Sequence, residues 1–258
     1  MSISLLLIAI AEGLTEFLPV SSTAHLILIG KIATVNLTDP YVKFYILFIQ
    51  LGALVAGVML FSKRILTDKS LIVNISASFL PTAVIGFTLY KLFKHLLEGN
   101  LILMAVALVL GGVLLISIEK LIAQRAAIED YGRDTITIKD AFLIGCAQAF
   151  AMVPGVSRSG ATIIAGIFMN IRKAVIVEYT FLLALPTLGA AVLYDGYKSL
   201  DMLSNIASWN ELLLGFLIAA ITAFVTLIVL RKYLPTISLA WFGWYRIILA
   251  TLILITLW

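Results

Sequence analysis

Long apolar runs, separated by short clusters of charged residues, dominate this chain of 258 residues. Each run has about 18–22 residues, the length with which an α-helix crosses about 30 Å of hydrocarbon. The composition agrees, because 62% of the residues are apolar and 12% are charged, against roughly 45–50% and about 25% in soluble domains. We therefore expect an all-α polytopic membrane protein that forms a single integral membrane domain over residues 1–258.

Six of the runs are uninterrupted and predict transmembrane helices at about 44–62, 72–90, 101–118, 175–195, 211–230 and 239–258. Two further apolar segments, 3–34 and 141–171, are broken by PVSST at 19–23 and by PGVSRSG at 154–160. Their arms are too short to span a bilayer, so each segment predicts a re-entrant helix–loop–helix pair. Broken helices at membrane depth require protein or a watery cavity around them, which makes both loops candidate walls of a site.

The two broken segments resemble each other. The sequence LIAIAE at 7–12 is similar to LIGCAQ at 143–148, and PVSS at 19–22 is similar to PGVS at 154–157. The matching segments lie 135 to 136 residues apart. This distance predicts internal repeats of about 1–120 and 138–258, each with one re-entrant pair and three spans. Because three crossings are odd in number, the second half enters from the opposite face. This is an inverted-topology repeat, which places a site near the bilayer midplane.

The basic residues predict the orientation. Eleven Lys and Arg residues fall on one side of the membrane and five on the side of the N-terminus. The positive-inside rule places the eleven in the cytoplasm, and it places both termini and the first loop on the outer side. Arg158 and Arg246 remain within or at the edge of the apolar segments. The net charge of +4 does not indicate nucleic-acid binding here, and the single cysteine, Cys146, excludes a cysteine-based metal cluster.

Two carboxylates lie inside the first arm, where ionisable groups are costly and functional by default. Glu12 and Glu16 are four residues apart and share a helix face. Their like charges destabilise each other unless a cation, a proton or an arginine lies between them. The alternative is that one of them is protonated and serves only packing.

Hydroxyl groups and one histidine follow at the start of the second arm. Ser21, Ser22, Thr23 and His25 stand where the free N–H groups of a helix N-terminus favour an anion. Such residues are also ordinary helix caps, and we expect at least one of them to have that role.

The second loop brings Ser157, Arg158, Ser159 and Thr162 to the start of another short helix. The preferred partners of the Arg158 guanidinium are carboxylate and phosphate. A structural salt bridge to Glu12 or Glu16 is the alternative interpretation. Taken together, these groups suit either phosphoryl transfer or the transport of ions and anions, and the pattern alone leaves both open.

Two longer strings carry a resemblance. EGLTEFLPVSSTAHL at 12–26 and PGVSRSGAT at 154–162 closely resemble the signature segments of the undecaprenyl-diphosphatase family, also called bacitracin-resistance proteins. The resemblance extends to residues 49–52 and 178–186 and so covers essentially the whole chain. One departure is Ala24, where the family usually has glycine, and its methyl group restricts how closely the loop backbone approaches a phosphate.

The resemblance implies a phosphatase of the plasma (inner) membrane that hydrolyses undecaprenyl diphosphate to undecaprenyl phosphate and inorganic phosphate. This recycles the lipid carrier for cell-wall synthesis and confers bacitracin resistance. It also implies a divalent cation, Mg²⁺ or Ca²⁺, held by Glu12 and Glu16, and a site on the outer side. By motif position, Ser22 is the first candidate nucleophile, His25 its proton-transfer partner or rival, and Arg158 the phosphate-holding arginine. The residues that would line the site or cap its half-helices are Ser21, Thr23, Ser157, Ser159 and Thr162.

The inverted repeat and the buried charges also favour a second function, that of a transporter or lipid flippase. The expected partners are the lipid bilayer and a long-chain isoprenyl diphosphate, without nucleic acid. Small residues such as Gly52 and Ala56 allow close helix packing, either within one chain or in a homodimer.

Overall fold

The computed structural model describes residues 2–97, 100–126, 132–199 and 208–256. Apart from one isolated bridge between Arg133 and Ile171, the regular elements in these ranges are helices. They are α1 (Ile3–Thr15), α2 (Ser22–Ile32), α3 (Pro40–Thr67), α4 (Lys69–Leu97), α5 (Leu101–Ala126), α6 (Ile138–Ala149), the 3₁₀ turn η1 (Phe150–Met152), α7 (Arg158–Phe168), α8 (Lys173–Lys198), α9 (Trp209–Tyr233) and α10 (Leu239–Ile255).

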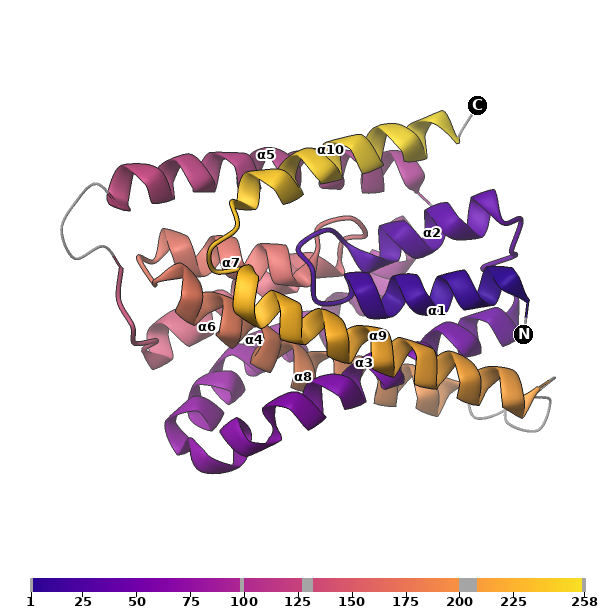
Figure 1. Ribbon diagram of the computed structural model, residues 1–258, viewed down its shortest axis with the longest axis horizontal. Helices are drawn as coiled ribbons and strands as arrows, with labels where there is room; N and C mark the ends of the chain where they lie inside the picture. The colour runs from indigo at the N-terminus through magenta and orange to yellow at the C-terminus, as the bar shows by residue number, and fades with distance from the viewer. Residues whose placement is uncertain (1, 98–99, 127–131, 200–207, 257–258) are drawn as a thin grey trace.

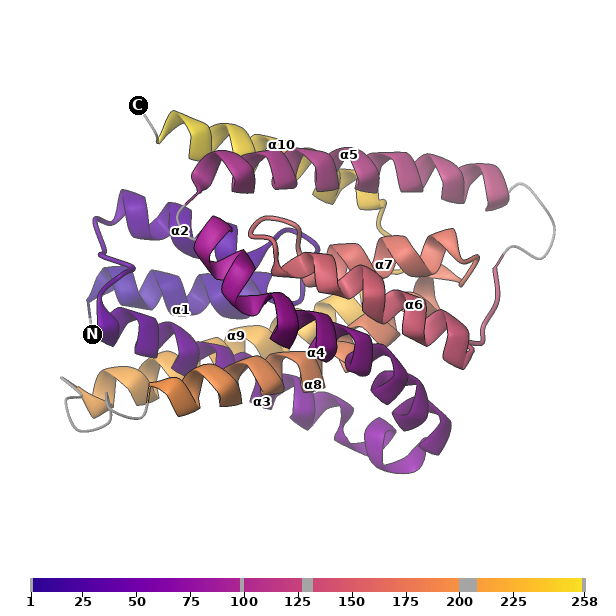
Figure 2. The same ribbon diagram turned by 180° about the vertical axis from the view of Figure 1, so that it is seen from behind.

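Within the described residues, five helices are long and apolar enough to cross a membrane, namely α3, α4, α5, α8 and α9. This confirms the expected all-α polytopic class. The sixth predicted span, 239–258, ends outside the described residues, and its described part forms α10, a shorter apolar helix of 17 residues. At 1.5 Å per residue it is about 25 Å long, somewhat less than a typical hydrocarbon core. Helix α10 lies along α5 in both views (Figures 1 and 2).

The remaining four helices form two hairpins, α1–α2 and α6–η1–α7. The hairpins come from opposite ends of the molecule, and their loops meet in its middle (Figures 1 and 2). The breaks fall at the predicted prolines and serines: the first hairpin leaves its helix after Thr15 and resumes at Ser22, and the second resumes at Arg158. Proline has no N–H to donate and disfavours a helical residue before it, so neither arm continues through its loop.

The second arms of the two hairpins share an unusual backbone. Within the described residues, the four non-glycine residues with positive φ are Ser21 (69°), Thr34 (52°), Ser157 (69°) and Asn170 (60°). They form two pairs with the same spacing along the chain, Ser21 with Ser157 and Thr34 with Asn170. The serines are the N-caps of α2 and α7, and the other two residues lie just after these helices end. Each arm therefore starts and stops with the same local geometry.

Aromatic packing fixes the end of the first arm. Phe17 is 1% exposed and meets Phe181 of α8 edge to face, with the ring centroids 6.2 Å apart. Phe61 of α3 also packs against Phe181, at 6.3 Å. A buried aromatic residue contributes a large apolar area. The residue directly before Phe17 is Glu16, so this contact holds the candidate carboxylate in place.

The base of the second hairpin is held by a polar cap. Thr137 and Asp140 form a capping box at the start of α6. Two guanidinium nitrogens of Arg133 donate to the Asp140 carboxylate, at 3.0 and 3.1 Å. Partial burial tends to raise the pKa of Asp140, but the hydrogen bonds from Arg133 and Thr137 outweigh it and hold the pKa below its ordinary value.

We expect Asp140→Asn to lower the free energy of unfolding by about 1 kcal/mol at neutral pH, the scale of a lost helix cap. Since the pKa of Asp140 is lower in the folded state, its contribution is present above the ordinary aspartate pKa of about 3.9 and is lost as the pH falls through the lowered value. Thermal unfolding in detergent at several pH values measures this difference. A gap between wild type and variant that persists undiminished in strong acid would contradict the assignment.

Candidate active site

Glu16, Ser22 and Arg158 lie together where the two loops meet. The Ser22 hydroxyl donates to one oxygen of Glu16 at 2.6 Å. Nη2 of Arg158 donates to the other oxygen at 2.7 Å, which makes a short ion pair. The side chains of Arg158 and Glu16 are 18% and 9% exposed. The salt bridge considered as an alternative for Arg158 is thus present, and it joins residues 142 positions apart in sequence.

The other guanidinium nitrogen of Arg158 is tied to α8. Nη1 donates to the Ala184 carbonyl and to the Thr187 hydroxyl, both at 3.1 Å. Helix α8 therefore orients the guanidinium through Nη1, while Nη2 faces Glu16. A guanidinium held in this way presents a fixed fork of donors to an incoming oxyanion.

Glu12 is the least satisfied polar side chain of the site. It is 0% exposed, and neither of its carboxylate oxygens has a hydrogen-bond partner among the described residues. The backbone N–H of Glu16 donates to the Glu12 carbonyl at 2.9 Å, so the predicted one-turn spacing of the two carboxylates holds. A buried carboxylate without a donor needs a proton or a cation.

A divalent cation fits this donor set. The described residues contain no group of three or more His, Cys, Asp or Glu side chains suited to a metal. Mg²⁺, however, is commonly held by one or two carboxylates together with substrate phosphates and water. Glu12 has two unused oxygens, and Glu16 lies one turn away, so these two residues could hold the ion once a diphosphate supplies the other ligands.

His25 is directed away from the carboxylates. Its Nδ1 lies 2.8 Å from the Ser21 carbonyl oxygen and its Nε2 lies 2.7 Å from the Tyr245 hydroxyl. The imidazole and the Tyr245 ring are nearly parallel, at 8°, with their centroids 5.6 Å apart. Both ring nitrogens are therefore engaged, and neither bonds Ser22 or Glu16. Tyr245 is not among the predicted site residues, because its place near a span end is typical of an interfacial aromatic belt.

The other predicted hydroxyl groups have different surroundings. Ser157 caps α7 by accepting from the Gly160 N–H at 3.3 Å, whereas Ser21 caps α2 without a side-chain hydrogen bond. Ser159 donates to the Leu18 carbonyl at 2.8 Å and so joins the second loop to the first. The remaining two differ in exposure: Thr162 is fully buried and bonded to Thr180 at 2.9 Å, and Thr23 is exposed. Phosphate contacts by these five hydroxyls stay predictions.

Comparison with known proteins assigns the chain to a protein family. The family model described as "Bacitracin resistance protein BacA" matches residues 5–252. The chain belongs to this family. It is 42% identical over 242 residues to a protein of Aquifex aeolicus named undecaprenyl-diphosphatase, with 94% of this chain and 93% of that protein covered. Proteins of the same name from Sulfurihydrogenibium sp. and Thermus thermophilus are each 40% identical, with 95% of this chain and 95% and 93% of their lengths covered.

Arg246, like Tyr245, is absent from the predicted site residues although it bonds both loops of the candidate site. It is 0% exposed and donates to five backbone carbonyls at 2.6–3.4 Å, those of Pro19, Ala107, Leu108, Gly155 and Val156. It thus joins both loops to α5. Room for it depends on Gly111, where an added Cβ would collide with the Arg246 guanidinium. The signal in the sequence is an arginine inside the last apolar run, a position where charge is costly.

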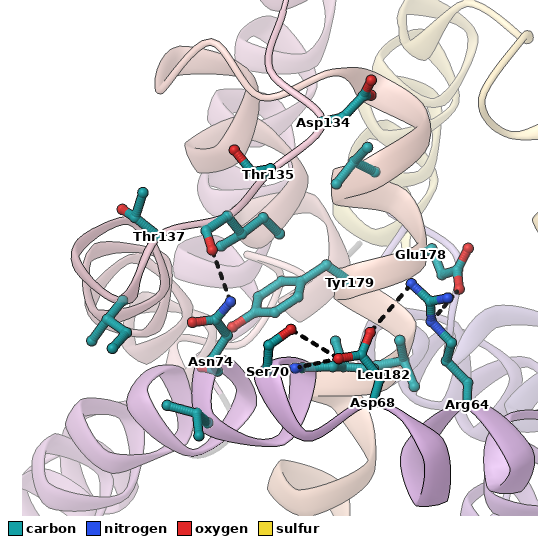
Figure 3. A pocket seen from close by; sticks show the side chains of 15 residues that line it. Arg64, Asp68, Ser70, Asn74, Asp134, Thr135, Thr137, Glu178, Tyr179 and Leu182 are labelled. Atoms are coloured by element: carbon teal, nitrogen blue, oxygen red, sulfur yellow. Dashed lines mark hydrogen bonds and ion pairs between the residues drawn. The ribbon is translucent and has the colours of Figure 1, made fainter.

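A separate cavity of about 630 Å³ lies between α4, the start of α6 and α8 (Figure 3). Arg64 crosses one side of it, 3.6 Å from Asp68 and 3.7 Å from Glu178. Asn74 donates to the Ile136 carbonyl at 2.8 Å on another side. None of Glu12, Glu16, Ser22 and Arg158 lines this cavity. The polar cluster between the loops, rather than this cavity, is therefore the candidate active site.

We expect Arg246→Lys to destabilise the protein by about 3 kcal/mol or more, because an ammonium cannot reach the five carbonyls and leaves several of them without a donor. Thermal unfolding of the purified protein in detergent measures the loss. Arg231→Lys, at an exposed position near the end of α9, is the matched control and should change little. Equal melting temperatures for Arg246→Lys and wild type would show that the loops do not depend on this residue.

Proposed function

We propose that this protein is an integral membrane phosphatase that hydrolyses undecaprenyl diphosphate to undecaprenyl phosphate and inorganic phosphate. The observation that carries the proposal is the Ser22–Glu16–Arg158 cluster, a hydroxyl, a base and an arginine within hydrogen-bond distance. The names of the BacA-family relatives support the diphosphate substrate. The same activity would recycle the lipid carrier for cell-wall synthesis and confer bacitracin resistance.

The proposed reaction begins at Ser22. Its Oγ attacks the terminal phosphorus, while its proton passes to the Glu16 carboxylate 2.6 Å away. The bond between this phosphorus and the bridging oxygen breaks, and undecaprenyl phosphate leaves with the electron pair. Arg158 donates to the phosphoryl oxygens as negative charge develops on them. A water molecule then attacks the phosphoserine, the bond from phosphorus to Oγ breaks, and the proton on Glu16 returns to Oγ. The oxygen and both protons of the water leave with the inorganic phosphate as H₂PO₄⁻.

The surroundings of His25 favour Ser22 as the nucleophile. The Ser22 hydroxyl already donates to a carboxylate, whereas both nitrogens of His25 are bonded elsewhere. For the same reason Glu16 is better placed than His25 to accept the proton. A bound Mg²⁺ or Ca²⁺ on Glu12 and Glu16 would offset the charge of the diphosphate and polarise its oxygens.

We further propose that the chain is one membrane domain built as an inverted repeat of 1–120 and 138–258, with α10 as its sixth span. Two observations support this topology. The hairpins come from opposite ends of the bundle (Figure 1), and the positive-φ residues of the first hairpin recur at the same spacing in the second. With the basic residues on the cytoplasmic side, both termini and the active site face the outer side of the plasma membrane.

The deciding experiment is release of inorganic phosphate from a long-chain isoprenyl diphosphate by purified protein in detergent. Detergent micelles have no two sides, so a transporter or flippase would release nothing. If the protein releases no inorganic phosphate from undecaprenyl diphosphate in the presence of Mg²⁺ or Ca²⁺, the proposed function is overturned.

We expect Ser22→Ala to reduce kcat by at least about 10³-fold, the scale seen when a nucleophile is removed, with little change in stability, since Ser22 is only partly buried. Ser62→Ala is the matched control, because Ser62 is an exposed serine of α3 that donates to the Met59 carbonyl of its own helix. Phosphate release and thermal unfolding are measured on both variants. Wild-type activity in Ser22→Ala would remove Ser22 from the mechanism.

We expect Glu12→Gln to abolish phosphate release while leaving the protein as stable as wild type or more so. An amide of the same shape removes a buried charge that has no donor among the described residues. Mg²⁺ added together with a diphosphate should raise the melting temperature of wild type by mass action and leave that of Glu12→Gln unchanged. If the variant keeps both its activity and its Mg²⁺ response, Glu12 is a protonated packing residue.

A further inference from the structure

The first loop is held differently from the second, although their geometries match. Ser21 and Ser157 have the same φ of 69°. Ser157 supports its own conformation by accepting from the Gly160 N–H, but the Ser21 side chain makes no cap hydrogen bond. A left-handed conformation at a non-glycine residue persists only where its surroundings hold it. Among the described residues, the side chain that bonds the Ser21 carbonyl is the His25 imidazole, which so helps to hold this conformation.

This contact determines the proton positions on His25. A carbonyl oxygen can only accept, so Nδ1 of the ring carries the proton that it donates to Ser21. In the neutral ring Nε2 then has a lone pair, which accepts from the Tyr245 hydroxyl at 2.7 Å. The opposite tautomer would direct the Nδ1 lone pair at the carbonyl oxygen. The Ser21 carbonyl thus selects this tautomer, and the Tyr245 hydroxyl stabilises it by donating to Nε2.

The peptide that His25 holds is the one from which the nucleophile projects. The Ser21 carbonyl and the Ser22 N–H belong to one planar peptide unit, and Ser22 is the first residue of α2. Fixing that carbonyl fixes the direction in which Ser22 leaves the loop toward Glu16. The arrangement is confined to this loop, because the repeat that pairs Ser21 with Ser157 pairs His25 with Ala161 and Tyr245 with Val109.

We infer that Tyr245 is a positioning residue for the phosphatase reaction, acting from α10 through His25 and the Ser21 carbonyl on the orientation of Ser22. The inference rests on the proposed function, because it needs Ser22 to be the nucleophile. Among the described residues, the Tyr245 hydroxyl bonds His25 and neither Ser22 nor Glu16. Tyr245 is 46% exposed, so removing only the hydroxyl leaves the packing of α10 intact.

Tyr245→Phe tests the inference with two independent readouts. The first is the ¹⁵N NMR spectrum of the imidazole in a His95→Gln background, in which His25 is the only histidine of the chain. We expect one tautomer, protonated at Nδ1, before the Tyr245 substitution, and a mixture after it. The second is steady-state kinetics, in which kcat should fall about tenfold, as for a lost hydrogen bond, while KM is unchanged. Trp244→Phe, an exposed neighbour on the same helix, is the control and should alter neither.

The outcomes separate the inference from the proposed function. A fall in kcat without a change of tautomer, or a change of tautomer without a fall in kcat, overturns the positioning role. If the wild-type protein releases no phosphate at all, the proposed function fails and the inference fails with it. In that case a tautomer that still shifts in Tyr245→Phe shows only that the Tyr245–His25 contact exists.

Discussion

A loop that ends inside an apolar bundle presents backbone carbonyls where water does not reach them, and each one without a donor costs several kcal/mol in a membrane. Both hairpins of this protein end in that way. Arg246 donates five hydrogen bonds there, three to loop carbonyls and two to carbonyls of α5. Because one guanidinium serves both loops, the loops are held relative to each other as well as to the bundle. The positions of Ser22 and Arg158 follow from this arrangement.

The two loops contribute opposite charges to the site. The first brings the carboxylates, and the second brings Arg158, so the 2.7 Å ion pair with Glu16 forms only when the loops meet. In the second hairpin, Gln148 occupies the position that corresponds to Glu12. Gln148 is 2% exposed and donates to Thr82 of α4, a structural contact rather than a catalytic one. The carboxylates of the candidate site thus lie in the first hairpin, and the second hairpin provides Arg158, which faces Glu16.

The site is also where the fold is least satisfied. Glu12 is fully buried without a hydrogen-bond donor among the described residues, while Arg246 has a partner for each guanidinium nitrogen. Natural proteins depart from local consistency mainly at functional sites. A buried carboxylate without a donor costs free energy, and the cation of the proposed function would offset that cost.

The sequence by itself determined the class of the protein and the places where its helices break, and it supplied the acidic, hydroxylic and basic residues of the candidate site. These are local properties, because apolar run length, proline and clustered charge act over a few residues. It did not determine which partner each residue takes. Arg158 bonds Glu16 rather than Glu12, and His25 bonds Tyr245 rather than Ser22. Arg246 joins two loops that lie far apart in sequence. Such contacts depend on how α10, α5 and the hairpins pack, and only the tertiary structure brings these distant segments within hydrogen-bond distance.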